Sequence, residues 1–364
     1  MAVPPLNAYM VPIPCVRRLL TLSNRWEYSA NGAIWSAWAG ASIKFSFSGH
    51  SSPPSSLFMR LGPKTQRKDR WNGGTPMFAV TVSPTPNSQP SAVTTETFDG
   101  EAGAIACIWN APSGAERLAV GWAPERYLVE IVLIDWASIL EIDGFITDDS
   151  TYLIGHPTTQ SPPMLLIGDS ISCGFAVEKS QGGQPIPLGT LNAFPSHAMR
   201  LLRNQVPRNL DLEIVAYPGI SLVGLNSALG MVDRFFRATP WDTNTWTPRG
   251  DPEFICIALG TNDEANDVEP DTFRTTLERF IHTLSTTFTS VKTFYIIPPF
   301  RDFNEADAGA IYRNLVSQPF TAGDIDIRIC DDINSGITSA HTVDGFTRPW
   351  ENFARFIQKQ MSYS

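Results

Sequence analysis

The sequence predicts a two-part α/β protein, with a β-rich first part over residues 1–155 and an α/β domain built on a parallel sheet over residues 160–364. The first part contains short runs of alternating polar and apolar residues, which are typical of half-buried strands. Beyond residue 163 apolar strands alternate with amphipathic helices, a pattern that favours a parallel sheet with helices on both faces. The length of 364 residues also exceeds that of most single cores.

Strand candidates in the first part are separated by turns rich in Gly, Pro, Asn and Ser. The clearest is Ser42–Ser48, where polar and apolar residues alternate. The others are residues 57–61, 77–82, 104–109, 118–122, 128–134 and 139–142. Many short strands at this spacing predict a jelly-roll-like β-sandwich. Most of the tryptophans lie in this part, where they serve core packing or carbohydrate binding.

The second part follows a Pro/Thr/Ser-rich link at Thr151–Pro163. Its strand candidates are residues 164–167, 212–216, 254–259, 293–297 and 325–329. Its helix candidates are residues 195–204, 225–237, 270–286, 305–316 and 349–361. In the helix at 270–286 the apolar side chains fall on one face, which predicts packing against the sheet.

Composition narrows the choice of partner and location. A net charge of −9 without a dense basic run argues against a nucleic-acid or anionic-membrane surface. The sequence shows no apolar stretch of about 20 residues and no basic start followed by an apolar core. The five cysteines form no CxxC pair. We therefore expect a soluble, cytoplasmic protein with a small-molecule substrate, no metal, no cofactor and an oligomeric state left open.

The stretch Met164 to Gly174 is the one around which the second part is organised. Its four apolar residues predict a buried strand that runs directly into Gly168-Asp169-Ser170. Such a strand end places the Ser170 hydroxyl at the carboxyl edge of the sheet, where α/β folds bind ligands. An ordinary turn of Gly, Asp and Ser is the alternative interpretation.

Two further predicted strands end in residues that can donate hydrogen bonds. One ends in Tyr217-Pro218-Gly219, and the other in Gly260-Thr261-Asn262-Asp263. Cleavage of an ester by serine needs donors where the carbonyl oxygen becomes an oxyanion, and one donor can contribute about 3 kcal/mol. The N–H groups of Ser170 and Gly219 and the side chain of Asn262 would supply three.

In order and spacing, Gly168-Asp169-Ser170, Gly219 and Gly260-x-Asn262-Asp263 resemble the SGNH (GDSL-type) hydrolases. The β-rich first part also resembles the two-domain arrangement of family 2 carbohydrate esterases and related fungal and bacterial proteins. The resemblance implies a three-layer α/β/α domain in which Ser170 is the nucleophile and Gly219 and Asn262 complete the oxyanion hole.

The sequence departs from that family near its C-terminal end. The family closes its site with Asp-x-x-His before a final helix, whereas here Asp344 is followed three residues later by Thr347. Threonine is not basic and the neighbouring Arg348 stays protonated, so neither can act as a general base. A serine without a base is a weak nucleophile.

Three functions follow from this departure. In the first, His341 supplies the imidazole and the protein is a serine esterase or acyl transferase acting on a small or carbohydrate-linked ester. In the second, the pocket serves a cyclisation, dehydration or isomerisation of specialised metabolism, with Asp344, Asp263 or Asp169 as acid or base. In the third, the domain is an inactive binding module. A His341 nitrogen within about 2.6–3.2 Å of Ser170 Oγ would favour the first.

Overall fold

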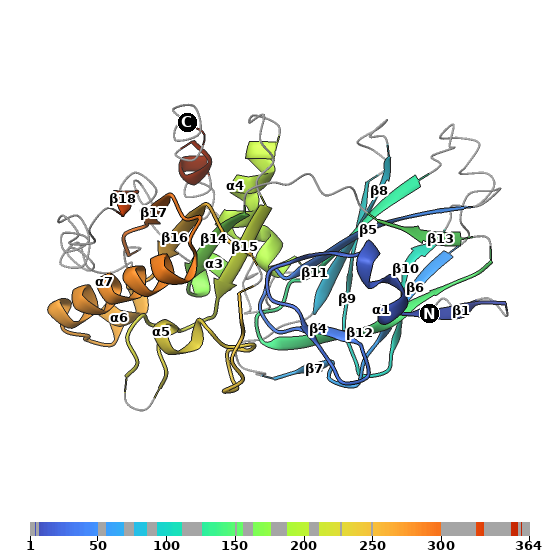
Figure 1. The fold of residues 1–364 in the computed structure, drawn as a ribbon, viewed down its shortest axis with the longest axis horizontal. Coiled ribbons are helices and arrows are strands. Elements are labelled where there is room, and N and C mark those ends of the chain that lie inside the picture. The colour runs from blue at the N-terminus through green and yellow to red at the C-terminus, as the bar shows by residue number, and fades with distance from the viewer. Residues whose placement is uncertain are drawn as a thin grey trace, which may run out of the picture. The chain divides into compact units, whose positions relative to one another are not determined.

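The structure is a computed structural model of the 364-residue chain. It describes residues 4, 7–49, 56–68, 76–85, 93–110, 126–149, 151–155, 163–175, 188–203, 211–225, 228–248, 250–299, 325–330, 351–355 and 358. The chain divides into two compact units (Figure 1). The first comprises Met1–Ala37 and Ala41–Thr158, and the second comprises Trp38–Gly40 and Thr159–Ser364.

The first unit contains two sheets whose strand pairs are all antiparallel among the described residues. One sheet has the order β10 (Ile105–Asn110), β6 (Ser56–Leu61), β12 (Ser138–Thr147), β4 (Ile34–Ser36) and β3 (Glu27–Tyr28). Two further strands also pair with β12, namely β1 (Tyr9–Pro12) and β7 (Gln66–Arg67). Between β1 and the next strand lie the short helices α1 (Ile13–Val16) and η1 (Arg17–Leu19).

The other sheet of this unit has the order β13 (Thr151–Ile154), β5 (Ser42–Gly49), β11 (Arg126–Leu133), β8 (Phe78–Thr85) and β9 (Thr94–Phe98). A further strand, β2 (Thr21–Ser23), pairs with β5. The strand candidates of the sequence are present here except the one at residues 118–122, which lies outside the described residues. The residues that open the predicted link form β13.

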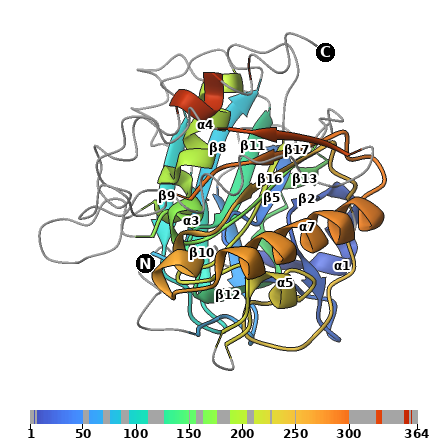
Figure 2. The ribbon, with the colours of Figure 1, turned by 90° about the vertical axis from the view of Figure 1, so that its left-hand side faces the viewer.

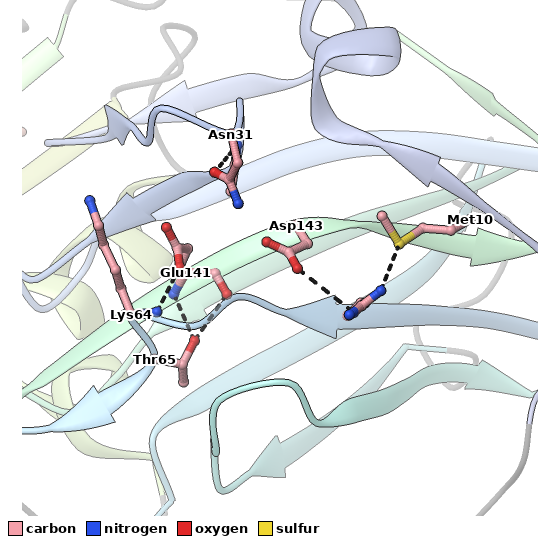
Figure 3. A network of polar contacts seen from close by, with 8 residues as sticks. Met10, Asn31, Lys64, Thr65, Glu141 and Asp143 are labelled. Carbon is pink, nitrogen blue, oxygen red and sulfur yellow. Dashed lines mark hydrogen bonds and ion pairs between the residues drawn. The ribbon is translucent and has the colours of Figure 1, made fainter.

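One hydrophobic cluster joins the two antiparallel sheets. Its buried side chains come from both, and the rings of Phe45 on β5 and Phe145 on β12 lie 4.6 Å apart. On β12 the buried Glu141 accepts hydrogen bonds from the Ser29 hydroxyl and, at 2.7 Å, from the Lys64 N–H. Figure 3 shows Glu141 beside Lys64 and Thr65. Because Thr65 Oγ1 also bonds the backbone of Glu141, this segment is tied to the strand at several points.

The second unit is built on a parallel sheet, as the alternating pattern predicted. Its order is β15 (Asp211–Ala216), β14 (Pro163–Gly168), β16 (Phe254–Ala258), β17 (Thr293–Ile296) and β18 (Asp326–Ile329). All neighbouring pairs are parallel. In chain order this is 2-1-3-4-5, so the direction of winding reverses between β14 and β16. The carboxyl edge at that reversal is where an open α/β sheet binds its ligand.

Helices lie on both faces of this sheet. The longest, α7 (Pro270–Thr287), begins with proline, which suits a first helical turn, and buries Phe273, Leu277, Phe280, Ile281 and Leu284. Figures 1 and 2 show α7 and α4 (Phe194–Arg203) on opposite faces. Shorter elements are α3 (Ser170–Cys173), η3 (Gly189–Asn192), α5 (Met231–Arg234) and α6 (Thr261–Ala265). No described helix is long and apolar enough to cross a membrane.

The helix predicted over residues 225–237 is wrong, because among the described residues of this range only α5 is helical. Leu225 and Ala228 exchange two backbone hydrogen bonds, and a Cβ added to Gly230 would collide with the backbone N of Gly224. These contacts prevent the described residues before Met231 from continuing the helix. Of the other predicted helices, residues 305–316 lie outside the described part, and residues 351–355 are helical within the predicted 349–361.

Candidate functional site

Three strand ends meet at the carboxyl edge of the parallel sheet. Gly168 on β14 is level with Ala216 on β15 and with Ala258 on β16. The three stretches singled out in the sequence follow directly, so that Ser170, Gly219 and Asn262 each come two to four residues after their strand. The reversal of winding lies at the same place, which makes this edge the candidate active site.

Ser170 is the first residue of α3 and is buried. The helix is capped by Asp169, whose Oδ1 accepts the N–H of Ile171 at 3.0 Å, and it ends at Gly174 with a φ of 81°. A helix of four residues has a small dipole, so the backbone N–H of Ser170 is the feature available to a negative charge. Among the described residues this N–H has no acceptor.

Gly168 is required by the close packing of α3 against β14. An added Cβ at this position would collide with Oγ of Ser172, a fully buried residue. Any larger residue would therefore push α3, and Ser170 with it, away from the strand. The hydroxyl of Ser172 has no hydrogen-bond partner in the described part of the chain.

Gly219 is an exposed residue of a turn and has a backbone N–H that is not used within the described residues. The turn is closed by a 3.3 Å hydrogen bond from Ile220 N to Tyr217 O, with Pro218 second and Gly219 third at a φ of 74°. Proline and a positive-φ glycine in these places are typical of a type II turn. An added Cβ on Gly219 would meet open space, and its N–H has no acceptor within the described residues. Its N–H is available to a bound molecule.

Asn262, on α6, connects all three strand ends. Its Nδ2 donates to Ile220 O at 2.9 Å and more weakly to Asp169 Oδ2 at 3.4 Å. The sequence predicted that this amide donates to a substrate oxygen, but here both of its hydrogens have protein acceptors. The longer bond is the one that a substrate oxygen would replace.

Asp263 is directed into the protein. Its Oδ2 accepts the N–H of Leu222 at 2.8 Å and its Oδ1 accepts the N–H of Val223 at 2.9 Å. The residue is 0% exposed. Burial raises the pKa of Asp263 to about 6, although the two N–H groups oppose the shift.

Asp169 is buried beside it. Burial raises the pKa of Asp169 to about 7; the N–H of Ile171 opposes this shift and the charge of Asp263 adds to it. The two carboxyls are therefore close enough for the charge of Asp263 to act on Asp169. Asp169 can exchange a proton near neutral pH, but both of its oxygens contact donors of the protein.

The predicted general bases cannot be placed from this structure. Asp344 and His341, and Thr347 between Asp344 and the final helix, lie outside the described residues. Of the described histidines, His282 is on the exposed face of α7 and His197 is on α4. Burial, together with the charge of Arg200, lowers the pKa of His197 to about 4.

Sequence reasoning missed the backbone acceptors and donors that join these stretches. Ile220, Leu222 and Val223 carry no special side-chain chemistry, and their partners lie 40 to 42 residues away. The Pro218-Gly219 pair was the one available signal, because it is typical of a type II turn. Among the described residues, no three His, Cys, Asp or Glu side chains are grouped as metal ligands would be.

Solved structures share this fold along nearly the whole chain. A family two carbohydrate esterase from Cellvibrio japonicus matches with a TM-score of 0.74 at 15% identity, over 98% of this chain and 98% of that chain. Another, from Clostridium thermocellum in complex with cellohexaose, matches with a TM-score of 0.69 at 15% identity, over 95% and 100%. The chain has an SGNH hydrolase-like fold.

The SGNH hydrolase-like fold also occurs in an acyltransferase. The salicylyl-acyltransferase SsfX3, from a tetracycline biosynthetic pathway, matches with a TM-score of 0.63 at 13% identity, over 98% of each chain. No protein-family model and no curated protein matches the sequence. Identities this low show a shared fold rather than a shared substrate.

Proposed function

We propose that the chain is a serine-dependent esterase or acyl transferase of the SGNH type, acting on a small or carbohydrate-linked ester, with Ser170 as nucleophile. The observation that carries this proposal is the pair of N–H groups of Ser170 and Gly219 at the ends of neighbouring strands, neither with an acceptor among the described residues. The fold supports an enzyme at the coarse level, because the structures that share it include esterases and an acyltransferase.

In the proposed reaction, Ser170 Oγ attacks the ester carbonyl carbon while a base accepts the hydroxyl proton. The new C–O bond moves the π electrons onto the carbonyl oxygen, where the N–H groups of Ser170 and Gly219 stabilise the charge. The carbonyl then re-forms, the C–O bond to the leaving alcohol breaks, and that alcohol takes the proton. Water releases the acyl group from Ser170 in hydrolysis, and an acceptor hydroxyl does so in acyl transfer.

Asn262 is the proposed third donor to the oxyanion. It would exchange its 3.4 Å bond with Asp169 for one to the substrate oxygen, and keep its 2.9 Å bond to Ile220 O. A charge-assisted bond to an oxyanion is stronger than the long contact that it replaces. Asp169 accordingly orients Asn262 before the substrate arrives.

We propose His341 as the base, with Asp344 nearby in sequence to orient it. The support is the sequence, since both residues lie outside the described part of the chain. His197 is a poor alternative, because a pKa of about 4 makes it a weak base at neutral pH.

The proposal is tested with p-nitrophenyl acetate and related acetyl esters. Ser170→Ala should lower kcat/KM by at least about 10³-fold, since it removes the nucleophile. The matched control is Ser172→Ala, two residues along the same helix and also buried, which should stay within threefold, or about 0.7 kcal/mol, of the wild type. Equal activity of Ser170→Ala and the wild type would refute the proposal.

The base is tested separately. His341→Ala should lower kcat by about 10²-fold or more, the usual contribution of general-base catalysis. The control is His282→Ala on the exposed face of α7, which should have no effect. If His341→Ala keeps the wild-type kcat, His341 is not the base and Thr347→His is the next variant to measure. A gain of esterase activity in Thr347→His would mean that the wild type lacks a base at the position where SGNH hydrolases usually carry histidine.

A second function is favoured by one observation, the pKa of about 7 at Asp169. A carboxyl that titrates near neutral pH suits acid or base catalysis in a cyclisation, dehydration or isomerisation of specialised metabolism. Both of its oxygens already bond protein donors, so we rank this function second. It predicts no acyl-Ser170 in mass spectra of the protein mixed with activated esters, whereas the first function predicts one.

We also infer that the two antiparallel sheets of the first unit face each other as a jelly-roll-like β-sandwich. The support is their common hydrophobic cluster and the contact of Phe45 with Phe145. A double-mutant cycle with Phe45→Leu and Phe145→Leu should give a coupling of about 0.5–1.5 kcal/mol, the usual range for an aromatic pair. A coupling near zero would contradict the facing arrangement.

A further inference from the structure

The segment that follows Gly219 is held by two adjacent residues from another strand end. Asn262 bonds the carbonyl of Ile220, and Asp263 bonds the N–H groups of Leu222 and Val223. The three bonds measure 2.9, 2.8 and 2.9 Å. Together they fix the chain one to four residues after the glycine whose N–H faces the proposed oxyanion.

This segment has little regular structure of its own. Between β15 and β16 the only described helix is the single turn α5, so tertiary contacts set the path of the chain. At the start of α5, Met231 N donates to Ser221 O at 2.8 Å. Gly230 lies so close to Leu222 O that an added Cβ would collide with it. Leu222 is therefore held at its N–H by Asp263 and at its carbonyl by Gly230.

We propose that Asp263 is a positioning residue for the reaction at Ser170, because its carboxylate fixes Leu222 and Val223 and thereby the direction of the Gly219 N–H. This role rests on the proposed function. Asp263 does not touch the substrate, since it is fully buried and both of its oxygens are occupied. Its effect reaches the substrate through the backbone.

The chemistry of the contact explains why an aspartate suits this place. Two adjacent N–H groups need two acceptors, and a carboxylate supplies both. Asparagine supplies one acceptor and would turn its NH₂ group toward the other N–H. Alanine leaves both N–H groups without an acceptor, and a buried unsatisfied donor costs about 1–3 kcal/mol. The segment would relax to find water, and the Gly219 N–H would move with it.

The rival interpretation is that Asp263 stabilises the fold without affecting the reaction. Asp233 provides the matched control, because its Oδ2 also accepts a backbone N–H of the same segment, that of Gly230 at 3.2 Å. That bond is local to α5, whereas the bonds of Asp263 join two strand ends. If Asp263 only stabilises the fold, its variants and the Asp233 variant should have the same activity per folded molecule.

The test uses the full chain with Asp263→Asn, Asp263→Ala, Asp233→Ala and Ser170→Ala. A fluorophosphonate probe reports on the oxyanion geometry. Ser170 Oγ forms a P–O bond while the proposed base takes its proton, the P–F bond breaks and fluoride leaves, and the phosphoryl oxygen occupies the oxyanion position. Hydrogen exchange over residues 217–225 reports on the segment itself. Asp263→Asn serves as the milder variant if Asp263→Ala fails to fold.

We expect Asp263→Ala to lower kcat and the labelling rate at least tenfold with KM within threefold, since a displaced oxyanion donor acts on the transition state. Asp263→Asn should fall between it and the wild type. Exchange over 217–225 should quicken at least tenfold, whereas Asp233→Ala should keep wild-type labelling and quicken exchange only around residues 229–234.

Two results would overturn the inference. Wild-type labelling by both Asp263 variants would show that Asp263 does not position the reaction, and the proposed function would stand. Unchanged exchange over 217–225 would show that it does not hold the segment. If Ser170→Ala is labelled as fast as the wild type, the proposed function is overturned, and this role of Asp263 with it.

Discussion

Glu141 in the first unit and Asp263 in the second are both 0% exposed carboxylates that bind donors from distant segments. Glu141 accepts from the Ser29 hydroxyl and the Lys64 N–H, and Asp263 accepts from two backbone N–H groups. They differ in where they lie. Glu141 is in the middle of β12, surrounded by paired strands, while Asp263 follows the carboxyl end of β16. The same chemistry therefore stabilises a sheet in one unit and shapes a candidate site in the other.

The largest expected effect is on stability at Glu141. Glu141→Ala leaves the Lys64 N–H and the Ser29 hydroxyl without their acceptor, and it empties a packed position, so we expect a loss of about 3 kcal/mol or more. Activity per folded molecule should not change. Urea unfolding, followed with an activity assay on the folded fraction, measures both quantities.

Glu130→Ala is the matched control for Glu141. Glu130 lies on β11 and forms a 3.4 Å ion pair with Lys44 near the surface. Such pairs contribute about 0–1 kcal/mol, so this variant should unfold close to the wild type. A reduced kcat in folded Glu141→Ala would break the comparison, because it would give the first unit's carboxylate a role in the reaction.

The next largest effect is a change in pH dependence at Asp169. Burial raises the pKa of Asp169 to about 7, above the ordinary value of 3.8 in the unfolded chain. The folded state then holds a proton that the unfolded state releases, so this group lowers stability as pH rises from about 4 to 7. The slope for one such group reaches about 1.4 kcal/mol per pH unit.

Asp169→Asn should remove that slope. Asparagine can still accept the Ile171 N–H as a helix cap, so the local structure should survive. The stability of the variant relative to the wild type should rise with pH between 4 and 7 and level off above it. A parallel pair of stability curves, measured by urea unfolding across this range, would mean that Asp169 keeps an ordinary pKa in the folded protein.

The strands of the second unit could be predicted well from the sequence, and the turn before α5 could not. Apolar runs such as Met164–Ile167 and Phe254–Leu259 carry a strong local signal, and a strand buried on both faces reads as such a run. The apolar spacing at residues 225–237 gives an equally regular helical signal. It fails because Leu225 and Ala228 exchange backbone hydrogen bonds, and because Gly230 packs closely against the backbone of Leu222 and Gly224.

The candidate site shows the same limit. Ser170, Gly219 and Asn262 could be named from the sequence because each follows an apolar strand. Which atoms Asn262 bonds depends on strand order, and the place of β14 between β15 and β16 is set by tertiary packing. The burial of Asp169 and Asp263 has the same origin. Sequence alone gives their residue type but not the low-dielectric surroundings that raise their pKa.

A smaller effect of opposite sign is expected at Asp251, an acidic residue near the surface. Its carboxylate accepts the N–H and hydroxyl of Ser290 and the hydroxyl of Thr289. Although its slight burial acts in the other direction, these bonds lower the pKa of Asp251. Its contribution to stability is therefore present above the unfolded pKa of 3.8 and is lost as pH falls through the lower folded value.

Asp251→Ala should cost about 1 kcal/mol at pH 7, the usual net contribution of hydrogen bonds to an exposed acceptor. The cost should shrink below pH 4, where the wild type loses the same interaction. Thermal unfolding at pH 7 and pH 3 measures the difference. A cost that is the same at both values would show that the protonated carboxyl holds Ser290 as well as the carboxylate does.

The smallest expected effect is on stability at Ser172. Unlike Glu141 and Asp263, this buried residue has a side chain without hydrogen-bond partners among the described residues. The Ser172 hydroxyl is fully buried without a partner in the described part of the chain. Ser172→Ala removes that unpaired group and improves helix propensity, so we expect a gain of about 0.5–1 kcal/mol in the free energy of unfolding. Urea unfolding is sensitive enough to detect it. A loss of similar size would mean that the hydroxyl is satisfied by an enclosed water, since removing such a partner destabilises the fold. A gain would instead show that the fold tolerates an unpaired Ser172 hydroxyl beside Gly168.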